Sequence, residues 1–117
     1  MKKKYEFTGE TKLYEGRILQ RIKRCSDGLL GGWIEGSRNL SHEGSCFIHG
    51  EAKVFGEACV YGNAKVGKNA TIHGRAHVFG NALVSDNADA DNWSRVYGNV
   101  IVGDSAKICD SACVYGS

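Results

Sequence analysis

Two histidines and one aspartate are the residues of this sequence best suited to acid–base chemistry. His73 and His77 carry imidazoles, which exchange a proton near neutral pH and therefore suit a general base. Asp91 follows His73 by eighteen residues. If the fold brings these two together, the carboxylate would orient the ring and favour its charged form. Such an arrangement suits acyl transfer, so His73, His77 and Asp91 form a candidate catalytic set.

An acidic stretch follows along the chain and ends at a tryptophan. Asp86, Asp89 and Asp91 fall within six residues, and Trp93 comes two residues later. Carboxylates at this density either dock a basic partner or bind a hard cation. The alternative is a solvated acidic edge, and the sequence leaves both open.

A six-residue repeat predicts the elements that position these side chains. From residue 48 onward one position is aliphatic, the third is mostly Gly, Asn or Asp, and the fifth is mostly Ala. A period of six is not helical; it suits short strands joined by tight turns whose third residue adopts a left-handed backbone. We therefore predict an all-β fold in which 46–117 forms a β-solenoid of about four coils, each with three sides. The inward aliphatic positions are Ile48, Val54, Val60, Val66, Ile72, Val78, Val84, Ala90, Val96, Val102, Ile108 and Val114.

Residues 1–45 lack the repeat and predict a β cap on the first coil. Tyr5–Tyr14 predicts a hairpin with its turn near Gly9, and Arg17–Arg24 predicts a further strand. A turn is expected at Gly31–Gly32. The last coil is expected to expose unpaired backbone groups and to pair with the same edge of a second copy.

One segment of the chain resembles a known family. Leu30-Gly-Gly-Trp-Ile34 is followed by Asn39-Leu-Ser41, Gly44 and Cys46, and it is preceded by Arg17-Ile-Leu-Gln-Arg-Ile-Lys23. This arrangement is similar to the head of the YdcK-like hexapeptide-repeat proteins, a family of bacterial and prophage proteins often labelled as acyltransferases. The resemblance extends from about residue 12 to the end, and Phe47 stands where the family has tryptophan.

The resemblance implies a left-handed parallel β-helix and, for an acyltransferase, acetyl-CoA as the cofactor and a trimeric assembly. It implies no agreed catalytic residues. It also raises the expectation that this is a small phage-encoded protein.

Residues eighteen apart should stack in columns, so the repeat also predicts the surface. One column is aromatic, and His77 and Arg95 belong to the column beside it. A continuous aromatic stripe on a solvent-facing sheet is typical of a protein interface, although cross-strand pairs that only stabilise the sheet are the simpler interpretation. The aromatic column consists of Tyr61, Phe79, Tyr97 and Tyr115.

The other two faces have different predicted roles. Leu83 and Ile101 are exposed aliphatic residues beside small ones, so with Val114 of the last coil they are candidate oligomer contacts. The third face, with Phe55 and His73, is mixed and expected to be solvent-exposed. Because His73 and His77 should face different sides, they cannot share an ion within one chain, and the sequence assigns no metal site to the histidines.

Composition narrows the functional classes. Fifteen basic and 13 acidic residues give a formal net charge of +2, which argues against direct binding to nucleic acid through bulk charge. No apolar run is long enough to cross a membrane and no apolar stretch follows the basic N-terminus, so we expect a cytoplasmic protein, in the host cell if it is phage-encoded. Its 5 cysteines are expected to be reduced.

The sequence therefore favours a non-catalytic protein-binding β-solenoid. The expected partner is a host protein or complex, and the prophage resemblance suggests a defence complex of the CRISPR kind. One alternative is an acyltransferase that uses acetyl-CoA with His73 or His77 as the base. Another is a structural module that assembles with itself through the open last coil.

Overall fold

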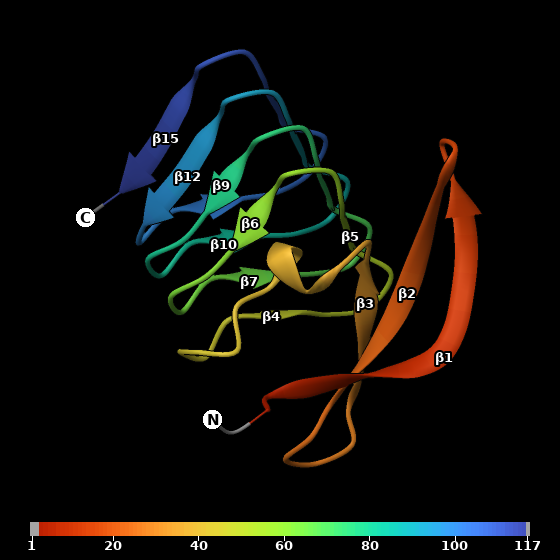
Figure 1. Cartoon of the computed structure of the whole chain (residues 1–117). Helices are drawn as coiled ribbons and strands as arrows, with labels where there is room; N and C mark the ends of the chain where they lie inside the picture. The colour runs from red at the N-terminus through yellow and green to blue at the C-terminus, as the bar shows by residue number, and fades with distance from the viewer. Residues whose placement is uncertain (1–2, 117) are drawn as a thin grey trace.

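The protein is a three-sided parallel β-helix with a β-hairpin cap, as the repeat predicts (Figure 1). The computed structural model describes residues 3–116. Within this range the only helix is the 3₁₀ turn η1 (Ser37–Asn39). No described helix is long and apolar enough to span a membrane.

Strands follow one another at a strict six-residue interval through the solenoid. Two long strands and one shorter one precede them: β1 (Tyr5–Tyr14), β2 (Arg17–Arg24) and β3 (Leu30–Ile34). The solenoid strands are β4 (Phe47–Ile48), β5 (Lys53–Val54), β6 (Cys59–Val60), β7 (Lys65–Val66), β8 (Thr71–Ile72), β9 (His77–Val78), β10 (Leu83–Val84), β11 (Asp89–Ala90), β12 (Arg95–Gly98), β13 (Ile101–Val102), β14 (Lys107–Ile108) and β15 (Cys113–Gly116).

Each side of the prism is a parallel sheet built from every third strand. One sheet has the order β4-β7-β10-β13 and another β6-β9-β12-β15, while β5-β8-β11-β14 continue a sheet that also contains β1-β2-β3. The cap supplies part of a further coil, because β3 pairs in parallel with β5 and Leu40 bridges to Val60. The solenoid therefore has about five turns, where the repeat alone predicts about four.

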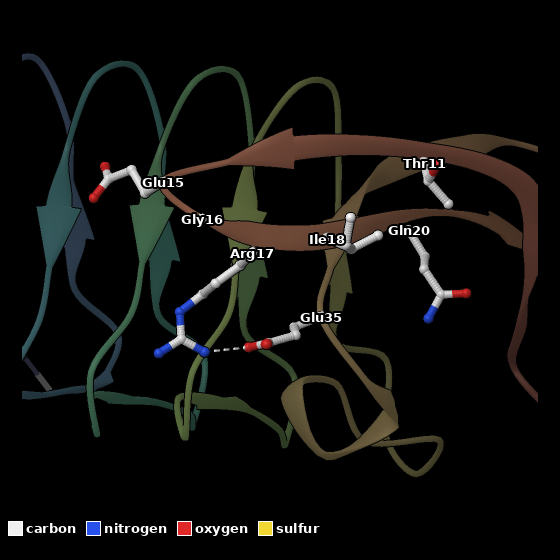
Figure 2. Close-up of a pocket in the computed structure, with 7 residues that line it drawn as sticks. All are labelled: Thr11, Glu15, Gly16, Arg17, Ile18, Gln20 and Glu35. Atoms are coloured by element: carbon white, nitrogen blue, oxygen red, sulfur yellow. Dashed lines mark hydrogen bonds and ion pairs between the residues drawn. The ribbon is translucent and has the colours of Figure 1, made fainter.

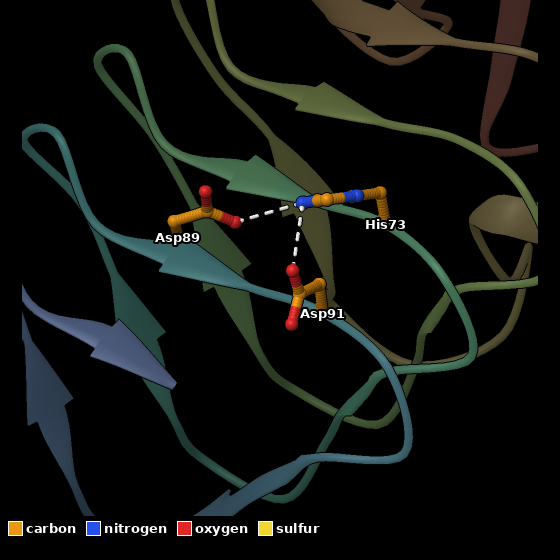
Figure 3. Close-up of side chains that lie close together, drawn as sticks. All are labelled: His73, Asp89 and Asp91. Carbon is orange, nitrogen blue, oxygen red and sulfur yellow. Dashed lines mark hydrogen bonds and ion pairs between the residues drawn. The ribbon is translucent and has the colours of Figure 1, made fainter. Parts of the chain in front are cut away.

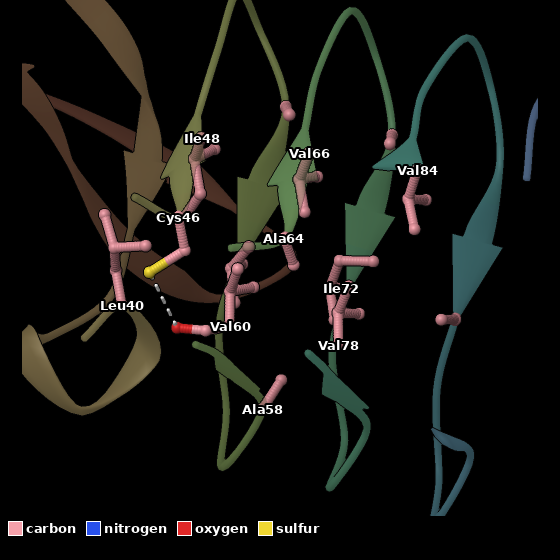
Figure 4. Close-up of a cluster of buried hydrophobic side chains, with 14 of the residues drawn as sticks. Leu40, Cys46, Ile48, Ala58, Val60, Ala64, Val66, Ile72, Val78 and Val84 are labelled. Atoms are coloured by element: carbon pink, nitrogen blue, oxygen red, sulfur yellow. Dashed lines mark hydrogen bonds between the residues drawn. The ribbon is translucent and has the colours of Figure 1, made fainter. Parts of the chain in front are cut away.

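The repeat positions have the predicted physical roles. The third-position residues turn the corners with positive φ, including non-glycine residues such as Lys68 and Asn92. Up to the last coil the aliphatic and alanine positions form one continuous buried core (Figure 4). In the last coil Ala106 and Ala112 are exposed and Val114 is only partly buried. Cys46 is buried at the first coil, where its thiol lies 3.7 Å from the carbonyl oxygen of Val60.

Two details of the cap differ from the sequence predictions. Tyr5–Tyr14 is one strand, not a hairpin: Gly9, at φ +98°, lies where the register with β2 shifts, and the turn comes at Glu15 and Gly16. Gly31 and Gly32 lie within β3 rather than in a turn. Both are buried there, and glycine is needed because a Cβ on Gly32 would lie 2.4 Å from the carbonyl oxygen of Ala52.

The hairpin also covers part of the face that was expected to be solvent-exposed. Leu19 of β2 packs on Trp33 and Phe55, and the ring of Tyr14 meets that of Phe55 edge-on at 5.7 Å. In Figure 2 the hairpin runs across the strands of successive coils, with Glu15 and Gly16 at its tip. Phe55 is consequently only 4% exposed.

The tight packing of Gly32 gives a first prediction. Gly32→Ala places a methyl group against backbone of the first coil and should lower the free energy of unfolding by about 1–3 kcal/mol, the usual cost of overpacking. Gly67→Ala is the matched control, because its added methyl would meet only the Cβ of His49, at an ordinary 3.6 Å. Urea denaturation measures both. Equal destabilisation by the two substitutions would contradict the account.

The docking of the N-terminus gives a second prediction. The ring of His42 stacks on Tyr5 at 4.1 Å, and its Nδ1 accepts the backbone N–H of Lys4 at 3.1 Å. Burial, followed by the charges of Lys4 and Lys3, lowers the pKa of His42. A lowered folded-state pKa means that the unfolded chain binds more protons, so this stability is complete above the unfolded value of about 6.5 and is lost as the pH falls below it.

His42→Asn keeps an acceptor near the position of Nδ1 but cannot titrate. It should therefore flatten the fall in unfolding free energy between about pH 7 and pH 5.5, measured by urea denaturation at several pH values. An unchanged slope would show that His42 does not contribute to it.

Candidate functional site

The aromatic column forms a continuous stack of nearly parallel rings. The centroid distances are 4.9 Å from Tyr61 to Phe79, 5.0 Å from Phe79 to Tyr97 and 5.3 Å from Tyr97 to Tyr115, with interplanar angles of 2°, 6° and 11°. Each ring is at or directly after a strand of the β6-β9-β12-β15 sheet. All four are partly or fully exposed. We call this stack, together with His77 and Arg95 in the neighbouring column, the aromatic face.

Polar groups line the same face. The hydroxyl of Tyr61 lies 3.3 Å from Nδ1 of His77, whose ring meets that of Tyr61 edge-on. Burial, followed by Cys59, raises the pKa of Tyr61, while Arg95 opposes that shift. The hydroxyl therefore remains protonated at neutral pH. Arg95 is exposed and makes no ion pair with any residue in the described range.

An exposed tryptophan occupies the far corner of the aromatic face. Trp93 is 58% exposed, and the guanidinium of Arg75 lies 4.7 Å from the centre of its ring. This is cation–π geometry. Glu57, one coil below Arg75, pairs instead with Arg38 at 3.7 Å.

The predicted acidic patch is divided by the fold. Asp86 turns a corner at φ +60°, where its carboxylate accepts the N–H of Asp104 and pairs with Lys68 at 3.1 Å. The Asp104 hydrogen bond, and then Lys68, lower the pKa of Asp86. Trp93 stands at the next corner and is stacked with Arg75. Of the four predicted residues, only Asp89 and Asp91 converge.

These two aspartates meet His73 on the β8–β11 pair (Figure 3). Nε2 of His73 lies 2.9 Å from Oδ1 of Asp89 and 3.6 Å from Oδ2 of Asp91. The predicted pairing of His73 with Asp91 is therefore present, but Asp89 is the closer partner. Side chains two apart on a strand face the same side, so both carboxylates flank the buried Ala90 and point outward. The alternation of Asp89, Ala90 and Asp91 in the sequence is enough to predict that the two carboxylates share one face of the strand.

The cap hairpin helps to position this cluster. The ring of His73 stacks on that of Phe55 at 5.2 Å and 21°, and Phe55 is itself held by Tyr14 of the hairpin. The pKa of Tyr14 is raised by burial and then by Glu15, with a smaller contribution from Asp89. The hairpin end thus lies near the cluster, which sequence periodicity could not indicate because the hairpin is outside the repeat.

His77, the other candidate base, lies on a different sheet. It belongs to β9 of the aromatic face, whereas His73 follows β8. The two cannot act on one substrate within one chain, so the predicted catalytic set reduces to His73 with its two carboxylates.

The candidate oligomer contacts are also separated. Leu83 and Ile101 are neighbours on the β4-β7-β10-β13 sheet, and Ile101 is 75% exposed. Val114 lies on β15 and is partly buried against the core. Only the first two can form one surface.

An open hollow beneath the hairpin is lined by three charged side chains, Glu15, Arg17 and Glu35 (Figure 2). Its two facing charges, Arg17 and Glu35, pair with each other at 2.8 Å. Glu35 also accepts the N–H of Gly56 at 2.9 Å. Burial alone would raise the pKa of the Glu35 carboxyl, but the hydrogen bond from Gly56 and the charge of Arg17 together lower it. Glu35 therefore connects the cap, through Arg17, with the solenoid, through Gly56.

Comparison with known proteins assigns the chain to no family. No protein-family model matches the sequence, and a search of curated proteins gives no match. The resemblance to the YdcK-like proteins stays a prediction.

Proposed function

We propose that this protein is a non-catalytic binding module that docks on another protein through its aromatic face. The residues proposed to make the contact are Tyr61, Phe79, Tyr97, Tyr115, His77 and Arg95. The observation that carries the proposal is the unbroken stack of four rings on one exposed sheet.

The stack has the properties of an interface anchor. Binding ordinarily costs entropy because exposed side chains must be immobilised. Rings held within 4.9–5.3 Å of each other are already ordered, so less entropy remains to be lost. Aromatic side chains beside arginine are also the residues most enriched among interface hot spots. The rings also remain accessible to a partner, because Tyr61, Phe79 and Tyr97 are partly exposed and Tyr115 is exposed.

The charges of this face indicate the partner's chemistry. Arg75 and Arg95 form no ion pair among the described residues, whereas Glu57 is already paired with Arg38. The available charge on the face is therefore positive. We propose a partner whose surface is apolar and bordered by carboxylates.

The biological setting of the proposal rests on the resemblance to prophage proteins. On that basis we propose a phage-encoded protein, acting in the host cytoplasm, whose partner is a host defence complex of the CRISPR kind. The geometry of the aromatic face supports the contact itself and not this choice of partner.

The double substitution Phe79→Ala with Tyr97→Ala tests the aromatic face. Tagged wild type should retain one host protein in stoichiometric amount, and the double variant should retain on the order of 30-fold less or none, as expected for hot-spot residues. Circular dichroism and thermal unfolding must show that the variant remains folded. Undiminished capture by the folded variant would contradict the proposal.

Three further substitutions separate the effect of charge from the effect of location. Arg95→Glu should weaken capture more than Arg95→Ala does, and the difference should shrink at high salt if the partner is acidic. Ile101→Ala, on another sheet, is the matched control and should leave capture unchanged. If the chain self-associates through Leu83 and Ile101, Ile101→Ala should reduce that association and the Arg95 substitutions should not.

The acyltransferase alternative has one observation in its favour, the hydrogen bond that holds His73 against a carboxylate. It predicts that acetyl-CoA binds and that His73→Gln abolishes transfer. Absence of binding at millimolar acetyl-CoA in a calorimetric titration would exclude it. The self-assembly alternative predicts a particle mass that rises with concentration instead of reaching a small closed oligomer.

A further inference from the structure

The geometry of His73, Asp89 and Asp91 points to a binding site for a divalent transition-metal ion such as Zn²⁺ or Mn²⁺. This inference goes beyond the proposed binding function and is independent of it, because the cluster lies on a different sheet from the aromatic face. It also joins two features that the sequence predictions treated separately, because His73 was set aside as a ligand and the acidic stretch was considered for a hard cation without it.

The distances suit a single ion. One imidazole nitrogen and two carboxylate oxygens lie within 4.8 Å of one another. The separations from His73 are 2.9 Å to Asp89 and 3.6 Å to Asp91. Ligand atoms that each lie about 2.0–2.2 Å from a shared tetrahedral ion are separated by roughly 3.3–3.6 Å, so small side-chain adjustments would admit the ion.

The positions of these side chains are fixed by the backbone. Asp89 and Asp91 flank Ala90 on β11, and β11 pairs in register with β8, which places Asp91 level with His73. The imidazole is held from below by its stacking on Phe55 at 5.2 Å. The three groups are only 19–34% exposed at their side chains. A partly built and partly shielded site therefore exists without rearrangement of the chain.

The charge balance also indicates a cation. Asp89 and Asp91 form no ion pair with Lys or Arg among residues 3–116, in contrast to Asp27 with Arg24 and Asp86 with Lys68. Two nearby carboxylates repel each other unless a positive group lies between them.

An unused oxygen gives a second, independent indication. Oδ1 of Asp91 is buried and has no hydrogen-bond partner in the described structure. Buried polar atoms are normally satisfied. A bound ion would orient the Asp91 carboxylate, and its coordinated water could supply the missing donor.

The donor set selects the class of ion. Imidazole with two carboxylates is a mixed nitrogen and oxygen set, which suits Zn²⁺ and Mn²⁺, whereas Ca²⁺ and Mg²⁺ prefer oxygen ligands alone. Three protein ligands leave at least one coordination position for water or another small ligand.

Titration of the EDTA-treated protein tests the site. Calorimetry with Zn²⁺ should show one ion per chain. Mn²⁺ should broaden the amide NMR signals of residues 71–75 and 88–93 before others, and because this hard ion disfavours thiolates, the map separates the site from the free cysteines. Absence of binding of both ions at millimolar concentration would overturn the proposal.

Matched variants assign the ligands. His73→Gln, Asp89→Asn and Asp91→Asn should each weaken binding at least about 10-fold, whereas His77→Gln and Asp86→Asn should not change it. The two asparagine variants keep the side-chain size, so they test the site even if His73→Gln fails to fold. Equal affinity in Asp89→Asn and Asp86→Asn, or broadening centred elsewhere, would refute the assignment.

Discussion

The hydrogen-bond ladder between successive coils is the interaction on which the rest of this structure depends. Within the repeat the N–H of one residue donates to the carbonyl seventeen residues later, as in Lys53 to Ala70 and Phe55 to Ile72. This ladder holds only if every coil has the same length. Because the described strands recur every six residues from Phe47 onward, each side chain lies directly above or below the one eighteen residues away. An insertion of one residue would disrupt the columns at the coil that contains it, because residues before and after it would no longer be eighteen apart.

Both candidate sites are consequences of that register. The same spacing that stacks Tyr61, Phe79 and Tyr97 into one face also places Asp91 level with His73. The two sites occupy different sheets, so they can be altered separately. One has apolar rings and unpaired arginines, which suit a protein surface. The other has an imidazole and two carboxylates, which suit an ion. If a metal occupies Nε2 of His73, that nitrogen cannot also act as a general base, so the metal site and the acyltransferase alternative exclude each other.

Sequence reasoning was most complete where the repeat applies; in the cap it predicted the strand Arg17–Arg24 correctly but misplaced the turns. The core, the corner residues and the aromatic column follow from a period of six, because each position has one physical role in every coil. The cap has no such period. Gly9 has the left-handed backbone expected of a turn, yet the same conformation serves a bulge. Gly31 and Gly32 were assigned to a turn because glycine is common there, whereas the actual reason is contact with the backbone of the next coil.

The candidate sites were predicted less completely for the same reason. Asp91 was paired with His73 from the column alone, while Asp89 reaches the ring diagonally from two residues away. The cover that the hairpin gives to Phe55 depends on tertiary packing that no local pattern encodes.

Site-specific photo-crosslinking tests the central claim most directly. A photoreactive phenylalanine analogue placed at Tyr97 and, separately, at Ile101 would be irradiated in lysate of the proposed host cell. The account predicts one defined adduct to another protein from position 97 and none from position 101. An adduct to another protein from position 101 alone, or no adduct from position 97 in the folded protein, would contradict the assignment of the aromatic face as the docking surface.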